Sequence, residues 1–312
     1  MSRILVAGGA GFLGSHLCEA LLKKDNEVYC IDNFSSGHER NLSIISSDKR
    51  FNLVRQDVRS SLLSQPRCDV IINLGSRASR SEWEAFPIDV LTTNSEGTRN
   101  LLECAKSWKS KYICMSSSEI YGDPEVIPTP ESYPGHVSST GSRSSYDEGK
   151  RYSEALVMAY HREKLLDTVI IRLFNTFGPR IRGGNAYGRV IPRFVEQAMS
   201  NSPLTVYGDG SQTRTFMYVD DFIDAMLRII SSDYSGEVFN IGGQTEISVE
   251  ALAGAIISLT DSNSKIQKLP LPTADPKRRC PDITHATAAL DWTPKISLED
   301  GLSKFIAWHE SQ

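Results

Sequence analysis

The feature that most limits what this chain can fold into is a run of glycines directly after its first apolar segment. Residues 4–7 are Ile-Leu-Val-Ala, and residues 8–14 follow as Gly-Gly-Ala-Gly-Phe-Leu-Gly. Residues 12–24 then have the periodicity of an amphipathic helix. Glycines between a strand and a helix permit a tight turn, in which backbone N–H groups approach a phosphate at the helix N-terminus. We therefore predict a turn that binds a dinucleotide, with a purely structural glycine turn as the alternative.

The rest of the first half continues this alternation of strands and helices. Further short apolar runs predict strands at 28–31, 52–54, 70–74, 112–115 and 169–173. These runs are nearly continuous, as a sheet covered on both faces requires. Helices are expected at 94–109 and 145–166. The fold class that follows is α/β, a Rossmann-like doubly wound parallel sheet.

The second half has a different pattern of predicted strands and helices. Short strands and helices alternate with glycine-rich and proline-rich stretches after residue 174. We expect residues 1–174 to form the cofactor-binding domain, completed by elements within about 215–242. Residues 175–312 are expected to form mainly a smaller mixed α/β lobe that binds the substrate.

Charge and cysteine content exclude several classes of protein. The 34 Lys and Arg residues against 38 Asp and Glu residues leave a net charge of −4, which argues against a protein that binds nucleic acid or a membrane surface by electrostatics. We expect neither as a partner, no membrane-spanning segment and a cytoplasmic location. The six cysteines include no CxxC pair, so reduced thiols and no metal site are expected. Five should be buried, with Cys280 exposed in a basic loop.

Two acidic residues follow predicted strands at positions suited to a nucleotide. Asp32 ends the second predicted strand, where a carboxylate accepts hydrogen bonds from a ribose diol and repels a 2′-phosphate. NAD is therefore favoured over NADP. Asp57 and Val58 come just after the third strand, where they would meet the adenine. Either aspartate alone could be a turn or cap residue, so the prediction rests on their shared placement.

A phenol and an ammonium share one face of a predicted helix. Tyr146 and Lys150 stand four residues apart. A phenol with a pKa near 10 is a poor base at neutral pH, and lowering that pKa by about 3 requires roughly 4 kcal/mol from nearby cations. Ser116, Ser117 and Ser118 end another strand, where ligands of such sheets bind, so a hydroxyl there can share the substrate's proton with Tyr146.

Several longer segments carry a resemblance to a known family. They are GGAGFLGSHL (8–17), DNFSSG (32–37), SSSEIYGDP (116–124), SRSSYDEGKR (142–151), RLFNTFGPR (172–180), PLTVYGDGSQTRTF (203–216) and PDI (281–283). With them the chain resembles the extended short-chain dehydrogenase/reductase superfamily of sugar-nucleotide epimerases, dehydratases and decarboxylases. Within it, the UDP-glucuronate decarboxylases are the most similar.

The resemblance implies a cycle in which the sugar is oxidised and then reduced again. Tyr146 would take the C4 hydroxyl proton while hydride passes to NAD⁺. The uronic acid is then a β-keto acid, so carbon dioxide leaves and an enolate forms, to which protonated Tyr146 donates a hydrogen bond. Reprotonation at C5 and return of the hydride convert UDP-glucuronate to UDP-xylose with NAD recycled.

The resemblance also implies a set of site residues. Those expected to be catalytic are Ser117, Glu119, Tyr146, Lys150 and Arg279. Those expected to bind the cofactor are Gly8, Gly11, Phe12, Leu13, Asp32, Asn33, Ser35, Ser36, Asp57, Val58, Leu74, Ser76, Thr93, Tyr146, Lys150, Thr176 and Arg189. Those expected to bind the UDP-sugar are Ser118, Glu119, Asn175, Arg189, Tyr207, Gln212, Arg214 and Arg279.

Glu119 separates the branches of the superfamily. Similar dehydratases carry an Asp-Glu pair here, whereas this chain has Ser118-Glu119 and so lacks the acid that expels the C6 hydroxyl. Glu119 would order a water or position the sugar near C5; the alternative is a Glu that caps the adjoining turn. Decarboxylation is therefore expected, with a UDP-sugar or UDP-uronate 4-epimerase as the alternative. A 4,6-dehydratase and a non-catalytic NAD-sensing protein are less favoured.

One segment departs from the family's usual sequence. Residues 76–80 are Ser-Arg-Ala-Ser-Arg and are followed by Trp83, in place of a proline-containing stretch followed by Tyr. We hypothesise that Arg77 or Arg80 supplies positive charge toward the sugar carboxylate. Similar enzymes form homodimers through two long helices, here expected at 94–109 and 145–166. Their apolar side chains, among them Leu101, Leu102, Ala105, Leu156, Met158 and Ala159, face either a partner or the sheet.

Overall fold

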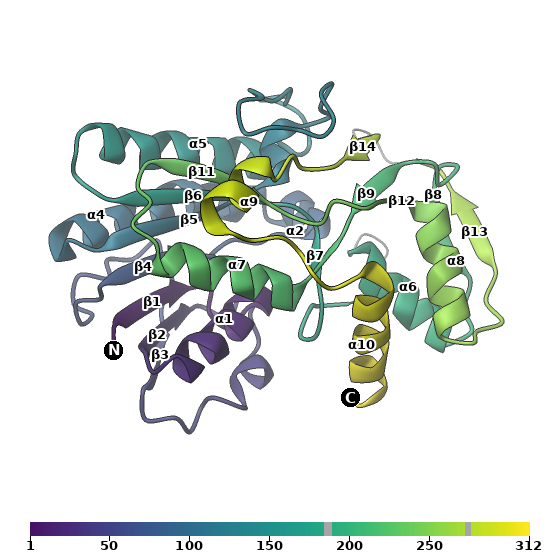
Figure 1. Ribbon diagram of the computed structural model, residues 1–312, viewed down its shortest axis with the longest axis horizontal. Helices are drawn as coiled ribbons and strands as arrows, with labels where there is room; N and C mark the ends of the chain where they lie inside the picture. The colour runs from purple at the N-terminus through teal and green to yellow at the C-terminus, as the bar shows by residue number, and fades with distance from the viewer. Residues whose placement is uncertain (184–188, 272–275) are drawn as a thin grey trace. The chain divides into compact units, whose positions relative to one another are not determined.

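The predicted strands assemble into one seven-stranded sheet in the computed structural model (Figure 1). The strands are β1 (Arg3–Ala7), β2 (Glu27–Asp32), β3 (Phe51–Arg55), β4 (Val70–Asn73), β5 (Lys111–Ser117), β6 (Thr168–Leu173) and β11 (Glu237–Ile241). Their order across the sheet is β11-β6-β5-β4-β1-β2-β3, and Ile4 pairs in parallel with Val28 on one side and Val70 on the other. The strand order reverses between β1 and β4. In open α/β sheets, ligands bind beyond the carboxyl ends of the strands at such a point.

The structure describes residues 1–183, 189–271 and 276–312, which divide into two units. The sheet unit comprises Met1–Ile120, Val137–Arg172 and Ile223–Phe239. The second unit comprises Tyr121–His136, Leu173–Phe222 and Asn240–Gln312. Neither unit is a continuous stretch of chain. The assignment of residues 1–174 to cofactor binding, completed by elements within about 215–242, and of residues 175–312 mainly to substrate binding stays a prediction.

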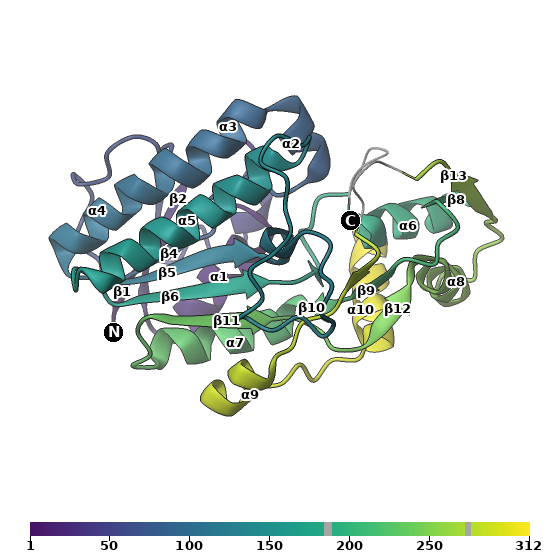
Figure 2. The ribbon, with the colours of Figure 1, turned by 90° about the horizontal axis from the view of Figure 1, so that it is seen from above.

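Helices cover both faces of the sheet, which confirms the predicted doubly wound class (Figure 2). Helices α1 (Phe12–Lys23) and α7 (Val219–Ser231) lie on one face, and α4 (Thr98–Trp108) and α5 (Ser144–Arg162) lie on the other. Two short helices that the sequence did not predict, α2 (Arg80–Ala85) and α3 (Pro87–Thr92), precede α4. A π-helical turn, η2 (Thr93–Gly97), joins α3 to α4. The predicted helix from residue 94 therefore begins as this turn.

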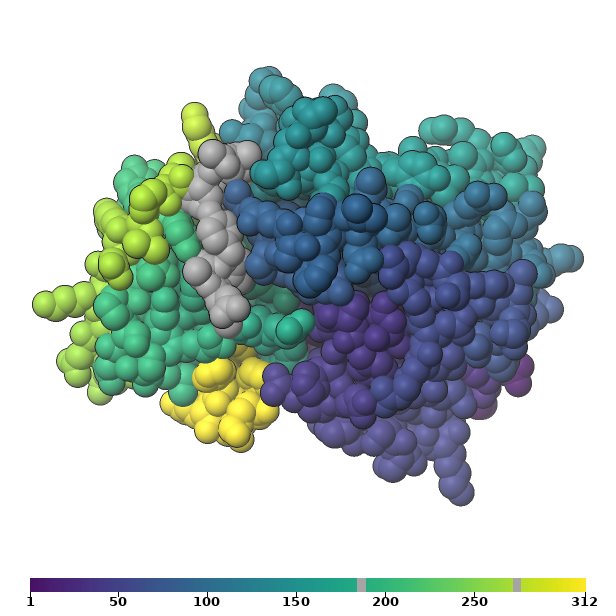
Figure 3. Space-filling view, turned by 180° about the vertical axis from the view of Figure 1, so that it is seen from behind, coloured from purple at the N-terminus to yellow at the C-terminus, as the bar shows by residue number. Residues whose placement is uncertain are grey.

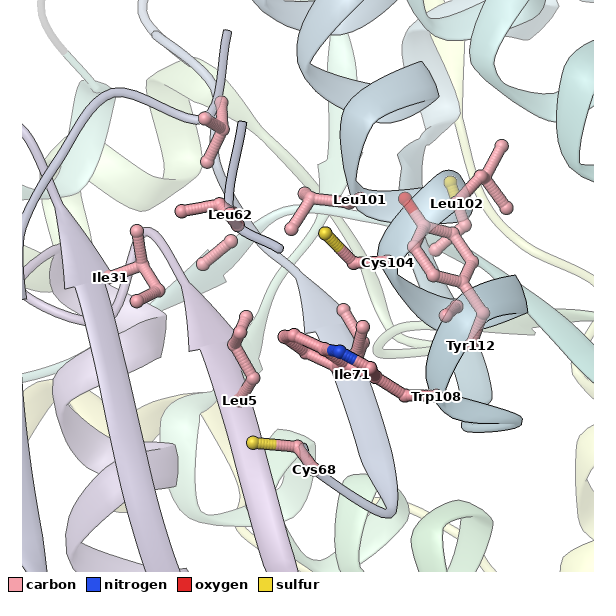
Figure 4. Packing of buried hydrophobic residues seen from close by; sticks show 14 of the residues in the cluster. Leu5, Ile31, Leu62, Cys68, Ile71, Leu101, Leu102, Cys104, Trp108 and Tyr112 are labelled. Atoms are coloured by element: carbon pink, nitrogen blue, oxygen red, sulfur yellow. The ribbon is translucent and has the colours of Figure 1, made fainter. Parts of the chain in front are cut away.

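The core of the sheet unit lies between α4 and the sheet (Figure 4). Leu5 and Ile71 project from neighbouring strands toward Leu101 and Trp108 of α4, and all are buried. Burying side chains of this size contributes about 1.5–3 kcal/mol each. Leu101, Leu102 and Ala105 belong to this core, so of the two orientations left open by the sequence they take the one facing the sheet.

The second unit is built from short elements. They are β7 (Thr176–Phe177), α6 (Val190–Met199), β8 (Leu204–Tyr207), β9 (Thr213–Thr215), β10 (Met217–Tyr218), β12 (Glu246–Ser248), α8 (Val249–Leu259), β13 (Ile266–Leu269), β14 (Arg278–Arg279), α9 (Thr284–Leu290) and α10 (Leu298–Glu310). Strand β8 pairs with β13, β7 pairs with β10, and β9 lies between β12 and β14.

The six cysteines are free and buried. Cys280 was expected to be exposed, and this prediction is wrong: the residue is only 4% exposed. Its carbonyl accepts a hydrogen bond from the Thr129 N–H at 2.8 Å, and its thiol lies 3.7 Å from the Gln244 carbonyl. The segment 121–136, which packs against it, is distant in the sequence. Among the described residues, no helix combines the length and apolar character needed to span a bilayer.

Candidate active site

The glycine turn joins β1 to α1 and leaves the start of α1 open. Gly8 adopts φ +75°, and a Cβ there would lie 2.8 Å from the Leu74 carbonyl oxygen. The Gly11 N–H donates to the Gly8 carbonyl at 3.1 Å, which closes the turn. Gly11 is the N-cap of α1 and provides no side-chain cap. Phe12 and Leu13 are the first helical residues, so their N–H groups are available to an anion, and the cradle fits a pyrophosphate.

Asp32 ties this turn to the end of β2. Its carboxylate accepts hydrogen bonds from the Ala10 N–H at 2.9 Å and the Phe34 N–H at 2.7 Å. Burial raises the pKa of Asp32, while the two backbone N–H groups act in the opposite direction. A largely buried carboxylate at this strand end can receive a ribose hydroxyl, which fits the adenosine half of NAD.

Asp57 follows β3 and is held by two partners. Arg59 donates to both carboxylate oxygens, at 3.0 and 2.8 Å, and Asn33 Nδ2 donates at 2.7 Å. The Arg59 guanidinium is the main reason that the pKa of Asp57 is lowered to about 2. Asp57 therefore stays ionised and links the loop after β2 to the loop after β3.

The other cofactor residues predicted in the sheet unit gather at the same edge. Strands β2, β3 and β4 pair in parallel with β1 or with each other, so the loops that follow them share the carboxyl edge of the sheet. The loops after β2, β3 and β4 and the η2 turn contain Ser35, Ser36, Val58, Leu74, Ser76 and Thr93. Thr176 and Arg189 lie in the second unit.

Tyr146 and Lys150 lie one turn apart on α5, and both are 5% exposed. The Lys150 ammonium lies 5.7 Å from the centroid of the Tyr146 ring. It also donates to the Met115 carbonyl of β5 at 2.8 Å, which fixes its position. Burial lowers the pKa of Lys150, and the neighbouring Cys114 and Glu154 counteract this. A cation held this close to the phenol favours its ionised form.

The end of β5 presents the serines and Glu119. The Ser117 hydroxyl accepts a hydrogen bond from the Glu119 N–H at 3.3 Å, and Ser118 begins a 3₁₀ turn, η3 (Ser118–Tyr121). The Glu119 carboxylate forms an ion pair with Arg143, one turn before Tyr146. Arg143 also lies 3.4 Å from Asp147. Glu119 is therefore tied to α5 by a guanidinium, a contact that the sequence analysis missed.

A largely buried charge pair joins α5 to β6. Glu154 accepts from Arg172 Nη2 at 2.8 Å and from Arg172 Nε at 3.0 Å, and the Ser116 hydroxyl donates to it at 2.5 Å. Sequence reasoning missed Glu154 as well. Its spacing of four residues from Lys150 was the signal that could have identified it.

Both arginines of the segment 76–92 that were considered for the sugar carboxylate have carboxylate partners. Arg77 lies 3.3 Å from Glu82 and stacks on Phe86, 4.4 Å from its ring centroid. Arg80 lies 3.2 Å from Glu84. Both guanidinium charges are matched by carboxylates of the same segment, which argues against the hypothesis that either one faces a sugar carboxylate.

The predicted substrate residues of the second unit form two groups. Gln212 Nε2 donates to the Tyr207 carbonyl at 2.9 Å, so these two residues meet at the end of β8. Arg214 of β9 pairs in register with Arg279 of β14. Paired residues of neighbouring strands project to the same side, so two cations stand next to each other, as a diphosphate requires. Asn175 Nδ2 donates to the Thr215 carbonyl at 3.3 Å.

A family model confirms what the fold and the glycine turn indicate. The model of the NAD dependent epimerase/dehydratase family matches residues 4–242, and the chain belongs to this family. NAD is therefore its cofactor. The open start of α1 and the buried carboxylate of Asp32 fit that cofactor.

Individual relatives extend this assignment. UDP-glucuronic acid decarboxylase 1 of Arabidopsis thaliana is 41% identical over 305 residues, which cover 98% of this chain and 69% of that protein. UDP-glucuronic acid decarboxylase 1 of Danio rerio is 42% identical and covers 98% of this chain and 72% of its own. A solved structure of UDP-glucuronic acid 4-epimerase from Bacillus cereus, in complex with UDP-glucuronic acid and NAD, matches with a TM-score of 0.91, 31% identity and 99% coverage of both chains. The predicted resemblance is thereby confirmed.

Proposed function

We propose that this chain decarboxylates UDP-glucuronate to UDP-xylose through a 4-keto sugar, with NAD recycled in each turnover. The observation that carries the proposal is the similarity to UDP-glucuronic acid decarboxylases, which extends over 98% of the chain. The placement of Glu119 at the end of β5, next to the serine hydroxyls, supports it further.

In this proposal Tyr146 moves the proton of the C4 hydroxyl. Bound NAD supplies the acceptor and later the donor of the C4 hydride. Lys150, whose ammonium lies 5.7 Å from the centroid of the Tyr146 ring, stabilises the phenolate, and Ser117 shares the hydroxyl proton. Once C4 is a ketone, the bond between C5 and the carboxylate breaks and carbon dioxide leaves. The electron pair of that bond is delocalised onto the ketone, which becomes an enolate. Tyr146 then holds the proton with which it donates to that enolate.

We assign to Glu119 a role at C5, the carbon that loses carbon dioxide. Arg143 neutralises its charge, so a second carboxylate near the uronate does not repel the substrate. Glu119 in turn orders the water or the sugar for reprotonation at C5. In the second unit, Arg214 and Arg279 receive the diphosphate, and Arg279 also faces the sugar. Residues assigned to the rest of the nucleotide and the sugar are Ser118, Asn175, Arg189, Tyr207 and Gln212.

Product mass tests the proposal directly. Purified enzyme is incubated with NAD and UDP-glucuronate that carries a labelled carboxyl carbon. We expect a product lighter by one carbon dioxide and release of the label, and neither with Tyr146→Phe. An isomer of unchanged mass would contradict decarboxylation.

That isomer is the prediction of the second candidate, a UDP-uronate 4-epimerase. The observation in its favour is the TM-score of 0.91 with the Bacillus cereus 4-epimerase. In this alternative the ketone is reduced from its other face and the carboxylate is retained. The same incubation therefore decides between the two activities.

We further propose that the protein forms a homodimer. The resemblance implies an interface on the helices expected at 94–109 and 145–166. Because Leu101, Leu102 and Ala105 of α4 face the sheet, we place the interface on α3, which leads into α4, and on α5 (Figure 3). Ile88 and Leu91 of α3 are 76% and 42% exposed, and Tyr152 of the neighbouring α5 is exposed as well. Apolar side chains gathered in this way mark a protein-binding surface. We expect Leu91→Glu to halve the mass measured by light scattering. Ile44→Glu is the control, because Ile44 is also apolar and exposed, at 69%, but lies just after η1 (Glu39–Leu42). An unchanged mass for Leu91→Glu would refute this interface.

We also propose a cytoplasmic location. The six free thiols suit a reducing compartment. Cell fractionation tests the proposal, and recovery with an organelle or membrane fraction would contradict it.

A further inference from the structure

A tryptophan stacks on the residue assigned as the proton acceptor. The indole of Trp83, on α2, lies 4.3 Å from the ring centroid of Tyr146 at an interplanar angle of 13°. Both side chains are 5% exposed and form one buried cluster with Val90. The nearly parallel rings make contact over their faces, the offset-stacked geometry that aromatic pairs favour.

The indole is itself held on several sides. Its Nε1–H donates to the Arg77 carbonyl at 3.1 Å, and Val90 packs against it within the cluster. The Arg143 guanidinium carbon lies 5.3 Å from its ring centroid. An aromatic ring fixed in this way restricts its stacked neighbour, because the Tyr146 ring cannot rotate out of its plane without displacing Trp83.

Charged groups lie close to both rings. Lys150 lies over the Tyr146 ring, and Arg143 lies over the Trp83 ring. The charge of Arg143 is matched by Glu119 and Asp147. Lys150 is therefore the cation that acts on the phenol, and Trp83 adds a rigid face rather than a charge.

We propose that Trp83 is a positioning residue for the reaction: by stacking on Tyr146, it holds the phenol in the one orientation from which its oxygen reaches the sugar hydroxyl. The proposal rests on the function assigned to Tyr146 above. It also gives the segment 76–92, which departs from the family's usual sequence, a role: α2 carries Trp83, which contacts Tyr146. Catalysis depends steeply on such placement, because a displacement of about 1 Å can cost on the order of 100-fold in rate.

Kinetics of matched variants test the stack. We expect Trp83→Leu, assayed as NAD-loaded enzyme with UDP-glucuronate, to lower kcat by roughly 10- to 100-fold while KM changes by less than about 3-fold. Trp83→Phe keeps a flat ring and should restore kcat to within about 3-fold of the parent. Trp108→Leu is the control, since Trp108 is similarly buried but packs in the cluster of Figure 4. The proposal is overturned if Trp83→Leu keeps its kcat, or if Trp83→Phe loses as much as Trp83→Leu.

A second measurement needs neither a substrate nor a destabilising substitution. Tyrosinate quenches the fluorescence of a nearby tryptophan, so ionisation of Tyr146 at 4.3 Å should lower the Trp83 emission of the NAD-loaded protein on alkaline titration. The chain has four tryptophans and eleven tyrosines, so we expect the amplitude of this step to fall, rather than vanish, in both Tyr146→Phe and Trp83→Phe. An unchanged amplitude in Trp83→Phe would overturn the stack even if UDP-glucuronate proved not to be the substrate. Absence of turnover with an intact fluorescence step would contradict only the proposed function.

Discussion

The same substitution at two helical glycines should have opposite effects on stability. Gly14 lies in the first turns of α1 against the glycine turn, and Gly254 lies on an exposed side of α8. A Cβ at Gly14 would lie 2.2 Å from the Gly8 carbonyl oxygen and 2.7 Å from the Gly9 Cα. A Cβ at Gly254 would meet no atom within 4 Å. The two sites therefore differ in the space available for one methyl group.

The magnitudes follow from these contacts. The atoms that face Gly14 are backbone atoms, so α1 would have to retreat by roughly 1 Å, and we place the cost at about 3 kcal/mol, the upper end for overpacking. Alanine regains about 1 kcal/mol over glycine inside a helix, which leaves a net loss of about 2 kcal/mol for Gly14→Ala. At Gly254 only the helix propensity acts, so Gly254→Ala should stabilise the protein by about 1 kcal/mol.

Urea unfolding followed by circular dichroism measures both effects, and NAD retention on gel filtration provides a second readout. We expect the two variants to differ by about 3 kcal/mol, by the sum of the estimates above, and only Gly14→Ala to lose NAD. If Gly14→Ala lay within about 1 kcal/mol of Gly254→Ala, the tight contact between helix and turn would be refuted.

Three further predictions concern charged side chains. The pKa of Asp57 is lowered to about 2, chiefly by Arg59. Ionised Asp57 should therefore stabilise the fold above its unfolded pKa of 3.8, and this stabilisation should be lost as the pH falls through about 2. Urea unfolding of Asp57→Asn should show a free energy of unfolding about 1 kcal/mol lower than the parent at neutral pH, allowing for solvent screening, and no difference in acid. Glu154→Gln leaves the partly buried Arg172 without its counter-charge and should cost about 3 kcal/mol in the same assay, the lower end for a buried pair, whereas a cost below about 1 kcal/mol would contradict this pairing. Because burial lowers the pKa of Lys150, turnover should decline on the alkaline side below pH 10.5, and Lys150→Arg, which stays charged, should remove that decline from the kcat–pH profile.

The sheet and its long helices were predictable because their signals are local. A strand such as β4 is buried along its whole length, so its residues Val70–Asn73 are almost all apolar. Strand β3 lies at the edge of the sheet, and Leu53 within it is 38% exposed. The expectation that this strand would be covered on both faces was therefore wrong. The sequence of one segment does not determine its place in the strand order, so the edge position of β3 could not be predicted from it.

The segment 76–92 and the contacts of the catalytic helix were harder to predict. Helices α2 and α3 have six residues each, too few for a helical period to stand out, and Pro87 begins the second of them. The stack of Trp83 on Tyr146 joins residues far apart in the sequence, so only the fold reveals it. Arg143 was within reach of sequence reasoning, since it precedes Tyr146 by one helical turn.

The strand order carries a consequence for synthesis of the chain. Strand β11 closes the sheet beside β6, yet most of the second unit is translated between them. During that interval the outer side of β6 is an unpaired edge, and such edges recruit other chains. A polypeptide that ends before Glu237 would therefore keep β6 as an unpaired strand edge. Such truncated products should aggregate rather than persist as a smaller dinucleotide-binding protein.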